Sequence, residues 1–462
     1  MHSYHNILWR EGTINPLVVS VKRFAKNILC RWQALKMCEN STMPRLLYTL
    51  LICLFLPLTP LRLLWRARRQ PEYLQHVGER FGFFKAFPTK PVIWLHCVSV
   101  GETRGAAPLV HKLIERYPDH SILITHGTPT GRATSEQLFG DKVLRCYLPY
   151  DLPFAVRRFL RHYQPQLGLL LETELWFNLI HICREQAIPL LLVNARMSEK
   201  SARSYAKLGR LARQGLQQLT VIAAQTEQDA SRLSALSGQH VEVTGNIKFD
   251  VTPTAEAIAA GVALRHTWGI GRPVFLAAST RVGEEELILD AVARLNVPGL
   301  LTVIVPRHPQ RFAVVAALLQ KRVIAFARRS DLVTKGGVAV ILGDSMGEMD
   351  VYYAACDVAF IGGSLLPYGG QNLIEACALG KPVLIGVHTY NFTESTLHAV
   401  ESGAARRVHD TQELTNILQT LMTDSDQRSR MGEAGIIFAE TNRGATQRTL
   451  ELIQRHCART TE

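Results

Sequence analysis

The feature that most constrains the fold is a repeated alternation of short apolar runs with amphipathic segments along most of the chain of 462 residues. Short apolar runs bounded by turn residues predict buried strands, and the periodic segments between them predict helices. Strands that alternate with helices form βαβ units around a parallel sheet. One series covers residues 92–237, including a helix expected over residues 201–217, and a second begins near Pro273. The sequence therefore predicts an α/β protein with two doubly wound, Rossmann-like domains.

The boundary between the two series is expected in residues 251–272, a polar and weakly patterned stretch that we interpret as a linker. In doubly wound domains ligands bind at the carboxyl ends of the strands, so we expect a site in a cleft that both domains face. The predicted division is a basic extension, an anchor, an N-terminal domain and a C-terminal domain, at residues 1–42, 43–70, 71–255 and 256–462. Residues 1–42 contain no motif, and we expect the natural start to be Met43.

The net charge of +13 is concentrated near the amino terminus. Residues 1–70 contain eleven Lys or Arg and two Asp or Glu, so about +9 of the excess lies there. A nucleic-acid-binding protein would spread its basic residues over a folded domain, whereas this chain places them beside an apolar segment. The distribution favours anionic lipid headgroups as the partner and disfavours nucleic acid.

That apolar segment, Leu46–Leu61, is the predicted membrane anchor, and it is flanked by Arg45 and by a cluster of arginines after Leu61. Its sixteen residues fall short of the roughly 20 that a spanning helix needs, and Pro57 and Pro60 are expected to kink its end. Two interpretations stay open: a span aided by snorkelling arginines, or a helix lying in the interface. The arginines after the segment favour a cytoplasmic location for the following domains.

Metal chemistry is not indicated. The nine cysteines are scattered, with no C-x-x-C, and neither H-E-x-x-H nor a Cys/His cluster with zinc spacing occurs. We interpret the cysteines as reduced thiols, several of them buried, and expect neither a metal nor a cofactor.

The stretch from residue 359 to residue 386 predicts a ligand site. An apolar strand ends in Gly362-Gly363-Ser364, a glycine-rich loop follows, and a helix is expected over Leu373–Leu379. Backbone N–H groups at such a turn can bind a phosphate, and Glu375 is placed to accept hydrogen bonds from sugar hydroxyls. A nucleotide-sugar pocket and an ordinary parallel-sheet crossover remain equally open on this loop alone.

Acidic residues follow two predicted strands of the first series. Glu102 lies on a glycine turn after the first strand, where it could act as a general base or merely cap the next helix. Glu172 and Glu174 directly follow the buried strand 167–171, and one of them could cap the helix that comes next. Lys248 lies near the linker, and its default interpretation is a solvated lysine.

Basic and polar residues follow the strands of the second series. Arg307 offers planar bidentate donors for a phosphate or carboxylate, and His308 beside it is either a ligand or a structural residue. Met346, Gly347 and Glu348 follow a third strand. These residues extend the candidate binding site.

Taken together, eight ordered motifs resemble one family, the Kdo (3-deoxy-D-manno-octulosonic acid) transferases of lipopolysaccharide assembly. The matching stretches are SVGE (99–102), ITHGTPTG (124–131), LETELWFN (171–178), NARMSEKS (194–201), TGNIKFD (244–250), VPRHPQRF (305–312), MGEM (346–349) and GGQNLIEA (369–376).

This resemblance implies a metal-independent, inverting glycosyltransferase of the two-domain GT-B architecture on the cytoplasmic face of the bacterial inner membrane. CMP-Kdo would be the donor, bound by the C-terminal domain, and a lipid A precursor (lipid IVA) the acceptor, bound by the N-terminal domain. It implies that Glu102 is the general base and that Glu172 and Lys248 stabilise the transition state. The implied CMP pocket consists of Arg307, His308, Met346, Gly347, Glu348, Asn372, Leu373, Ile374 and Glu375.

The motifs depart from the family pattern at two positions, Phe177 and Arg281, where we expect proline and histidine. The alternatives are another GT-B nucleotide-sugar transferase or an epimerase, a non-catalytic membrane-surface scaffold, and a nucleic-acid binder. The paired SVGE and ETELW motifs, together with the anchor, argue against another transferase or an epimerase. Intact Glu102, Glu172 and Lys248 argue against a non-catalytic scaffold.

Overall fold

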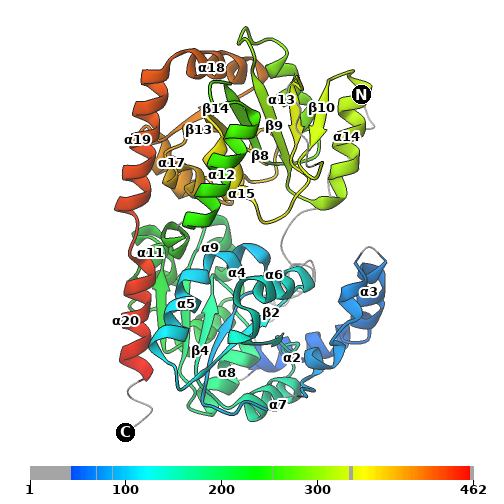
Figure 1. The fold of residues 1–462 in the computed structure, drawn as a ribbon. Coiled ribbons are helices and arrows are strands. Elements are labelled where there is room, and N and C mark those ends of the chain that lie inside the picture. Colours follow the sequence, from blue (N-terminus) through cyan, green and yellow to red (C-terminus); the bar gives the residue numbers. More distant parts are fainter. Residues whose placement is uncertain (1–42, 69, 86, 252, 332–336, 458–462) are drawn as a thin grey trace, which may run out of the picture. The chain divides into compact units, whose positions relative to one another are not determined.

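The computed structural model describes residues 43–457 except residues 69, 86, 252 and 332–336, so the predicted basic extension lies outside the described residues (Figure 1). The chain divides into two compact units. Unit 1 comprises residues up to Asp250 together with those from Gly444 on, and unit 2 comprises Val251–Arg443. Each unit contains one parallel sheet, so the predicted fold class of two α/β domains is confirmed.

Unit 1 is built on a seven-stranded sheet with the order β3-β2-β1-β4-β5-β6-β7. All neighbouring strands pair in parallel. The chain starts in the middle of the sheet and winds outward to both edges, which is the doubly wound topology. The strands are β1 (Val92–His96), β2 (Ser121–His126), β3 (Leu144–Tyr147), β4 (Pro165–Leu171), β5 (Leu190–Ala195), β6 (Val221–Ala224) and β7 (Glu242–Val243).

Helices cover both faces of this sheet, so the central strands are apolar throughout. Trp94 of β1 packs into a core formed with α7 (Pro153–Tyr163), α8 (Phe177–Glu185), α10 (Arg210–Gln217) and α11 (Glu227–Ser237). Ile93 and Leu95 point to the opposite core, formed with α5 (Ala107–Arg116), α6 (Pro129–Phe139) and α20 (Ala445–Cys457). The remaining elements are α4 (Val100–Gly105), α9 (Glu199–Ala206), η1 (Pro71–Leu74), η2 (Val77–Phe81), η3 (Gly140–Lys142) and η4 (Ile247–Asp250).

Unit 2 repeats this plan with the parallel strand order β10-β11-β9-β8-β12-β13-β14. Its strands are β8 (Val274–Thr280), β9 (Leu301–Pro306), β10 (Phe326–Arg328), β11 (Val340–Leu342), β12 (Val358–Ile361), β13 (Val383–Gly386) and β14 (Ala405–Val408). Its helices are α12 (Ala255–Trp268), α13 (Glu284–Val292), η5 (Pro309–Arg311), α14 (Phe312–Lys321), α15 (Met349–Ala355), α16 (Ile374–Ala378), α17 (Thr393–Glu401), α18 (Thr411–Thr423) and α19 (Ser425–Thr441).

The predicted anchor folds as two helices, α2 (Met43–Phe55) and α3 (Leu58–Ala67). Their axes bend by 55° at a break beside Pro57, as the prolines predict. Within the described residues no single helix is long and apolar enough to cross a bilayer, and the bent pair meets the criterion only when both helices are taken together.

The inner face of α2 is bound to unit 1. The Tyr48 hydroxyl donates to Asp151 Oδ2 at 2.8 Å, the Thr49 hydroxyl donates to Asn178 Oδ1 at 2.9 Å, and the Tyr48 ring packs edge-on against Phe177 at 5.1 Å. Helix α2 is therefore part of the fold of unit 1.

Three predictions about the elements are wrong. Residues 251–272 contain a helix, α12, rather than only a linker, because this alanine-rich segment has high helix propensity although it lacks an amphipathic stripe. The helix expected over residues 201–217 is split into α9 and α10, because Gly209 at the break takes a φ of +53°. The helix expected over residues 373–379 is the shorter α16.

The C-terminal boundary also differs from the prediction, which assigned all of residues 256–462 to one domain. The final helix α20 packs on unit 1, where Leu450, Leu452 and Ile453 enter the core. The pattern of apolar residues in α20 does not indicate which of the two sheets the helix covers.

Candidate active site

Glu102 lies in the first turn of α4, within a capping box. The Glu102 amide donates to Ser99 Oγ at 3.4 Å, and the Glu102 carboxylate accepts from the Val98 amide at 2.7 Å and from the Ser99 hydroxyl at 2.9 Å. The S-x-x-E spacing of SVGE produces this reciprocal arrangement. The Glu102 side chain therefore does cap the start of α4. These hydrogen bonds also hold its carboxylate in a fixed position at the carboxyl end of β1.

Glu172 and Lys248 form an ion pair. Lys248 Nζ donates to Glu172 Oε1 at 2.7 Å, across 76 positions of sequence, and both side chains are largely buried. Glu172 follows β4 with a φ of +57°, a conformation that is uncommon for a residue other than glycine and that is found at functional sites. The stem of Lys248 lies against Gly105, where a Cβ atom would come within 3.1 Å of Lys248 Cγ. Lys248 is therefore an ordered partner rather than a solvated lysine.

The two glutamates influence each other's ionisation. Burial raises the pKa of Glu102 well above its ordinary value, and the charges of Glu172 and Glu174 raise it further. Burial alone would also raise the pKa of Glu172, but Lys248 and Arg196 outweigh it and hold that pKa below its ordinary value. Unit 1 thus brings Glu102, Glu172 and Lys248 together, with two carboxylates whose pKa values are pushed in opposite directions.

Neighbouring loops support this arrangement. Asn194, with a φ of +53° at the end of β5, accepts the Ile247 amide at 3.1 Å through Oδ1 and so fixes the turn that carries Lys248. Asp250 ends the same turn and accepts the amides of Gly444 at 2.6 Å and Thr446 at 2.5 Å. The C-terminal helix α20 is therefore capped by the segment that positions Lys248.

In unit 2 a buried carboxylate, Glu284, joins two loops at the carboxyl edge of the sheet. It accepts the amides of Arg281, Gly363, Ser364 and Leu365 at 2.6 to 3.0 Å. Gly363 at the centre of this contact takes a φ of +72°. The glycine-rich loop after β12 is thus held by a residue of α13.

Arg307 and His308 lie beside this loop. Arg307 Nε donates to Gln371 Oε1 at 3.1 Å, and His308 Nε2 lies 2.6 Å from Arg281 Nη1. The Arg281 guanidinium also stacks over the Tyr368 ring at 4.9 Å. Arg281, a departure from the family pattern, is therefore in direct contact with a predicted binding residue.

The other predicted binding residues of unit 2 differ in what they offer a ligand. Asn372 Nδ2 donates to Glu375 Oε1 at 3.0 Å, which orients the Glu375 carboxylate. The side chains of Leu373 and Ile374 are buried in the core, so these two residues offer only backbone groups. Glu348 accepts the Ser345 hydroxyl at 2.5 Å, and Met346 is half exposed beside Gly347, which has a φ of +87°.

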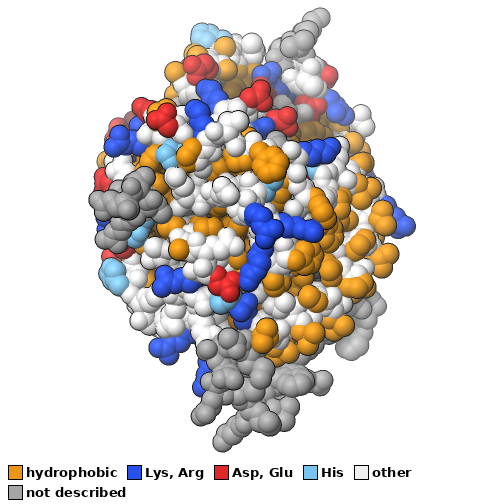
Figure 2. All heavy atoms as spheres, turned by 90° about the horizontal axis from the view of Figure 1, so that it is seen from below, with side chains coloured by type: hydrophobic (Ala, Val, Ile, Leu, Met, Phe, Trp, Pro, Cys, Tyr) orange, Lys and Arg blue, Asp and Glu red, His pale blue; other side chains and the backbone are white. Residues whose placement is uncertain are grey.

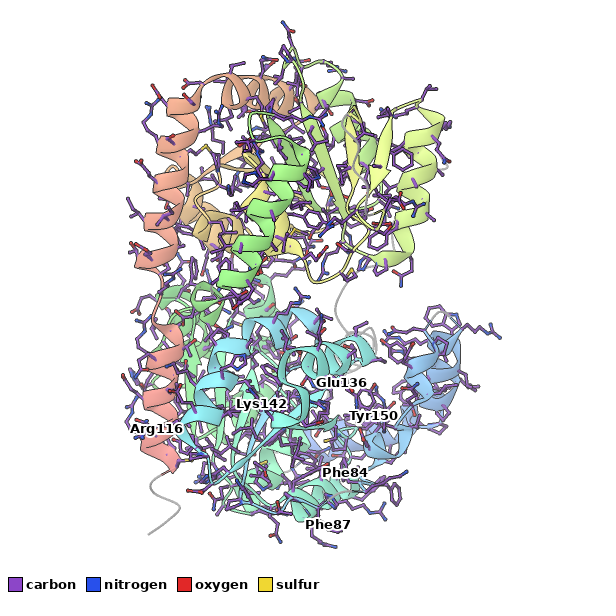
Figure 3. All side chains as sticks on the ribbon, viewed as in Figure 1. Phe84, Phe87, Arg116, Glu136, Lys142 and Tyr150 are labelled. Carbon is purple, nitrogen blue, oxygen red and sulfur yellow. The ribbon has the colours of Figure 1, made fainter. Side chains whose placement is uncertain are left out.

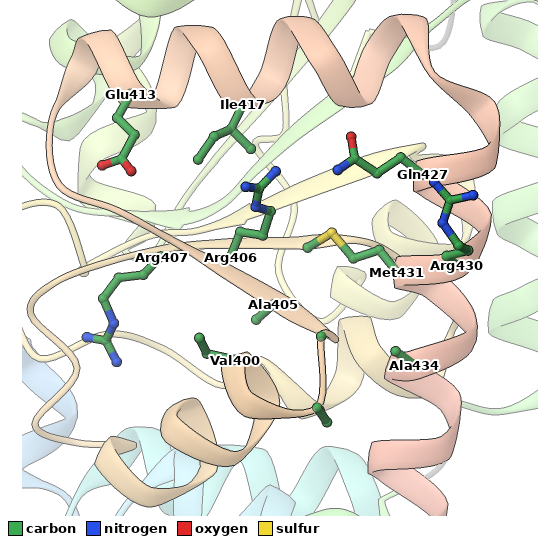
Figure 4. A pocket seen from close by; sticks show the side chains of 12 residues that line it. Val400, Ala405, Arg406, Arg407, Glu413, Ile417, Gln427, Arg430, Met431 and Ala434 are labelled. Atoms are coloured by element: carbon green, nitrogen blue, oxygen red, sulfur yellow. The ribbon is translucent and has the colours of Figure 1, made fainter.

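A pocket of about 540 Å³ lies elsewhere in unit 2, and Figure 4 shows it between β14, α18 and α19. Its lining includes Arg406, Arg407 and Arg430 but none of the predicted site residues. Within the described residues no group of three or more His, Cys, Asp or Glu is placed to hold a metal ion.

Sequence reasoning missed the residues that hold the site in shape. These residues include Glu284 and Asp151, and Asp151 accepts from Tyr48 of α2 at 2.8 Å and from the amides of Asn178 and Leu179 at 3.0 and 2.8 Å. The run Glu284-Glu285-Glu286 at a helix start was an available signal, since three acids exceed what one helix dipole needs.

Family models match two parts of the chain. A family model described as 3-deoxy-D-manno-octulosonic-acid transferase (kdotransferase) matches residues 75–251, and one described as glycosyl transferases group 1 matches residues 287–437. A solved UDP-GlcNAc 2-epimerase from Neisseria meningitidis bound to UDP-GlcNAc is 18% identical with a TM-score of 0.54, covering 79% of this chain and 100% of that chain. This likeness shows a shared fold.

Two curated relatives are much closer in sequence. The 3-deoxy-D-manno-octulosonic acid transferase of Bordetella pertussis is 42% identical over 418 residues, which cover 86% of this chain and 96% of that protein. The enzyme of the same name from Haemophilus influenzae is 40% identical over 423 residues, which cover 90% of this chain and 99% of that protein. On this evidence the chain belongs to the 3-deoxy-D-manno-octulosonic acid transferase family, and it is a glycosyltransferase.

Proposed function

We propose that this enzyme transfers Kdo from CMP-Kdo to a lipid A precursor (lipid IVA) with inversion at the anomeric carbon, without a metal ion or cofactor. The observation that carries the proposal is the convergence of Glu102, Glu172 and Lys248 in unit 1. A fixed carboxylate with a raised pKa, next to an ion pair, suits a reaction that must remove a proton from a hydroxyl group.

Glu102 acts as the general base. The acceptor hydroxyl oxygen forms a bond to the anomeric carbon of Kdo, its proton passes to the Glu102 carboxylate, and the bond between that carbon and the phosphate oxygen breaks. CMP leaves with the electron pair of the broken bond. The hydrogen bonds from Val98 and Ser99 hold the carboxylate in one orientation, which favours proton transfer because less reorganisation is needed.

The Glu172–Lys248 pair stabilises the charge that develops at the reacting carbon. The transition state resembles an oxocarbenium ion, as in glycoside hydrolysis, so a carboxylate kept ionised by its lysine stabilises it. The same ion pair keeps a negative charge near Glu102, which strengthens Glu102 as a base.

CMP binds unit 2. Arg307 and His308 supply donors for the single phosphate, and the Asn372–Glu375 pair supplies an acceptor for sugar hydroxyls. The backbone of Leu373 and Ile374 and the loop at Met346, Gly347 and Glu348 complete the pocket. A monophosphate leaving group carries less charge than a diphosphate, so basic side chains suffice without a divalent cation.

The anchor holds the enzyme on the cytoplasmic face of the inner membrane as a helix in the interface. The inner face of α2 is bound to unit 1, so the leucines of its outer face remain exposed, with Leu54 69% exposed. The exposed residues of this surface are Leu46, Leu50, Leu54, Leu58, Leu61, Leu64 and Trp65. Figure 2, a view from below, shows hydrophobic side chains gathered on one part of that face with Lys and Arg beside them.

The aromatic residues that follow the anchor divide into two groups. Phe84 packs on Phe159 and Tyr163 at 5.8 and 5.0 Å, so it belongs to the floor of unit 1. Phe83 and Phe87 are largely exposed and are available to the acyl chains of the acceptor. Figure 3 labels Phe87.

The experiment that tests the function is incubation of the purified enzyme with CMP-Kdo, generated in situ, and a lipid A precursor. Mass spectrometry of the lipid should show addition of one or more Kdo masses, and the number added gives the multiplicity. A second reaction, in which EDTA is added after CMP-Kdo has formed, should proceed at the same rate. The proposed acceptor would be rejected if the lipid A precursor stays unmodified while the enzyme consumes CMP-Kdo in a reaction with a different acceptor.

Membrane attachment has its own test. Replacing Leu46, Leu50 and Leu54 by serine should reduce binding to vesicles of phosphatidylethanolamine and phosphatidylglycerol without lowering the melting temperature. The control replaces the exposed Val314 and Val323 of unit 2 by serine and should leave vesicle binding unchanged. Equal vesicle binding by both variants would reject the role of α2.

A further inference from the structure

We propose that Arg281 is a positioning residue of the donor site, because it fixes the His308 ring as the neutral tautomer that carries its single proton on Nδ1. This inference rests on the proposed function, in which His308 binds the phosphate of CMP-Kdo, and it adds the protonation state in which His308 does so. Arg281 follows β8 and His308 follows β9, so both residues belong to unit 2. Arg281 is also one of the two positions at which the motifs depart from the expected family pattern.

The contact between the two side chains allows one assignment of protons. Arg281 Nη1 lies 2.6 Å from His308 Nε2. A guanidinium has N–H donors and no acceptor, and it keeps its proton in proteins, so Nε2 must be the acceptor. A ring nitrogen that accepts a hydrogen bond carries no proton, so the proton of the neutral ring is on Nδ1. His308 can therefore donate a hydrogen bond through Nδ1 alone.

The ends of β8 and β9 bring the two residues together. The Arg307 amide donates to the Thr280 carbonyl oxygen at 3.0 Å, which ties the loops that follow the two strands to each other. Strand β8 is irregular at this end, because its register with β9 shifts just before Thr280 and Ser279 takes a φ of +56°. An irregularity of this kind redirects the side chains beside it, and the next residue along the chain is Arg281.

The Arg281 side chain is enclosed, with only 5% of its surface exposed. Its guanidinium stacks over the Tyr368 ring at 4.9 Å, and the Tyr368 hydroxyl donates to the Val282 carbonyl oxygen at 3.1 Å. A Cβ atom on Gly363 would come within 3.4 Å of Arg281 Cγ, so the stem of the side chain lies against the glycine-rich loop. A side chain so enclosed acts through His308 rather than by direct contact with a ligand.

Positive charge beside the ring keeps a second proton off His308. Arg307 precedes His308 in the chain, and Arg281 is in contact with its Nε2 atom. An imidazolium would be repelled by both guanidinium groups, and it would also have no lone pair with which to accept from Arg281. The neutral ring is therefore the form that fits this place.

Two carboxylates of α13 lie close to the contact, but other groups already engage them. Glu285 accepts from Arg311 Nη2 at 2.8 Å and from the Thr280 hydroxyl at 2.9 Å, and Glu284 accepts four backbone amides. The neighbouring elements contribute the charged or titratable side chains of Arg281, Glu284, Glu285, Arg307, Arg311 and Tyr368. Three guanidinium groups against two carboxylates leave a positive surplus, which favours a neutral imidazole.

The consequence for the donor site is an affinity that does not depend on pH in the neutral range. A neutral imidazole donates one hydrogen bond to a phosphate, and Arg307 supplies positive charge at every pH. Without such an arginine a histidine takes up a second proton below about pH 6.5, and its hydrogen bond to a phosphate then becomes charge-assisted. Loss of Arg281 should therefore create a pH dependence that the wild-type site lacks.

The binding test uses the methyl ester of CMP as the probe and the full-length enzyme in detergent micelles. The phosphate of this probe is a diester with one negative charge throughout the range used, whereas a monoester gains a second charge near about pH 6. The wild-type Kd, measured by calorimetry, should change less than about twofold between pH 5.5 and pH 8. Arg281→Met should bind the probe about 5- to 10-fold more tightly at pH 5.5 than at pH 8, the difference between a charge-assisted and a neutral hydrogen bond.

Further variants separate positioning from structure. Arg281→Lys keeps a charged donor and should restore a Kd that is the same at both pH values. Arg281→Met/His308→Gln should also bind without pH dependence, because the group that titrates is gone. Arg265→Met is the control for lost stability, since it breaks an ion pair with Asp357 at 2.9 Å in the same unit and should leave the Kd independent of pH.

The tautomer can be measured without any ligand. Nitrogen-15 NMR of the histidine rings in the full-length protein, with His308 identified by its absence from His308→Gln, should show a proton on Nδ1 and none on Nε2 at both pH values. In Arg281→Met the same ring should carry both protons at pH 5.5. The wild-type spectrum decides the assignment even if Arg281→Met does not fold.

Two results would overturn the inference. One is a His308 ring in the wild-type protein that carries both protons at pH 5.5, or its single proton on Nε2. The other is a Kd that depends on pH equally in the wild-type enzyme and in Arg281→Met. A wild-type enzyme that does not bind the probe at all would instead reject the proposed donor site, and the NMR measurement would still report the tautomer.

Discussion

Lys248 Nζ lies 2.7 Å from Glu172 Oε1, and this ion pair joins the turn after β7 to the end of β4 in the centre of the unit 1 sheet. The two residues are 76 positions apart, so only the parallel topology brings them together. The pair keeps Glu172 ionised, and ionised Glu172 in turn raises the pKa of Glu102.

Replacing Glu102 by glutamine should lower kcat by about 100- to 10,000-fold, the usual contribution of a positioned general base. The glutamine carbonyl oxygen can still accept from the Val98 amide, and its NH2 group can donate to Ser99 Oγ, so the side chain keeps its place and the KM for CMP-Kdo should change little. Thr254→Ala is the control: it removes the cap of α12 in unit 2, where the Thr254 side chain accepts the Ala257 amide, and costs about 1 kcal/mol of stability while leaving Glu102 and its hydrogen bonds in place. Near-normal turnover by Glu102→Gln would remove Glu102 from the mechanism.

The dependence of kcat/KM on pH should report the raised pKa of Glu102. Glu102 must lose its proton to act as a base, so the rate should rise with pH through a pKa above the ordinary value of 4.5. Because Glu174 contributes to the shift, Glu174→Gln should move this acidic limb to lower pH. Glu115→Gln, at an exposed position of α5, should leave the limb where it is. An acidic limb that Glu174→Gln does not move would contradict the proposed coupling.

The same raised pKa has a consequence for stability. The folded protein binds the Glu102 proton more tightly than the unfolded chain does, so this group favours folding below its unfolded pKa. That contribution is lost as the pH rises through the folded pKa. Glu102→Gln should therefore stabilise the protein at pH 8 more than at pH 4, measured as the difference in melting temperature from wild type.

The sequence predicted the two sheets and the candidate site because both depend on local pattern. Strand ends are visible as apolar runs that stop at polar residues, and residues such as Glu102 and Glu172 stand at those stops. Contacts between distant segments leave no such pattern: neither the four amides that bind Glu284 nor the Tyr48–Asp151 hydrogen bond could be predicted. The helix α12 was missed for another reason, since it is alanine-rich and lacks the apolar periodicity that identifies an amphipathic helix.

Gly369→Ala should raise the KM for CMP-Kdo at least tenfold and lower the melting temperature. Gly369 takes a φ of +94°, and a Cβ atom there would overlap Asn391 and Tyr390, so the loop next to Asn372 must shift. Gly271→Ala is a matched control in the same unit, because nothing lies within 4 Å of the added Cβ and its φ is not positive. A similar KM in both variants would mean that this loop does not shape the donor pocket.

Asp250→Ala tests whether the C-terminal helix supports the catalytic lysine. Asp250 accepts the Gly444 and Thr446 amides at the start of α20, and its own turn carries Lys248. Loss of this cap should cost about 1 kcal/mol of stability, and the loosened turn should also lower kcat while the affinity for CMP stays unchanged.

Asp410→Ala separates the two effects of the Asp250 substitution. Asp410 caps α18 in unit 2, where it accepts the Glu413 amide at 2.8 Å, so its loss should lower stability by a similar amount without reaching Lys248. If kcat falls for Asp250→Ala but not for Asp410→Ala, the C-terminal helix α20 helps to position Lys248 in unit 1. Equal kcat values in two equally destabilised variants would show that α20 contributes to stability alone.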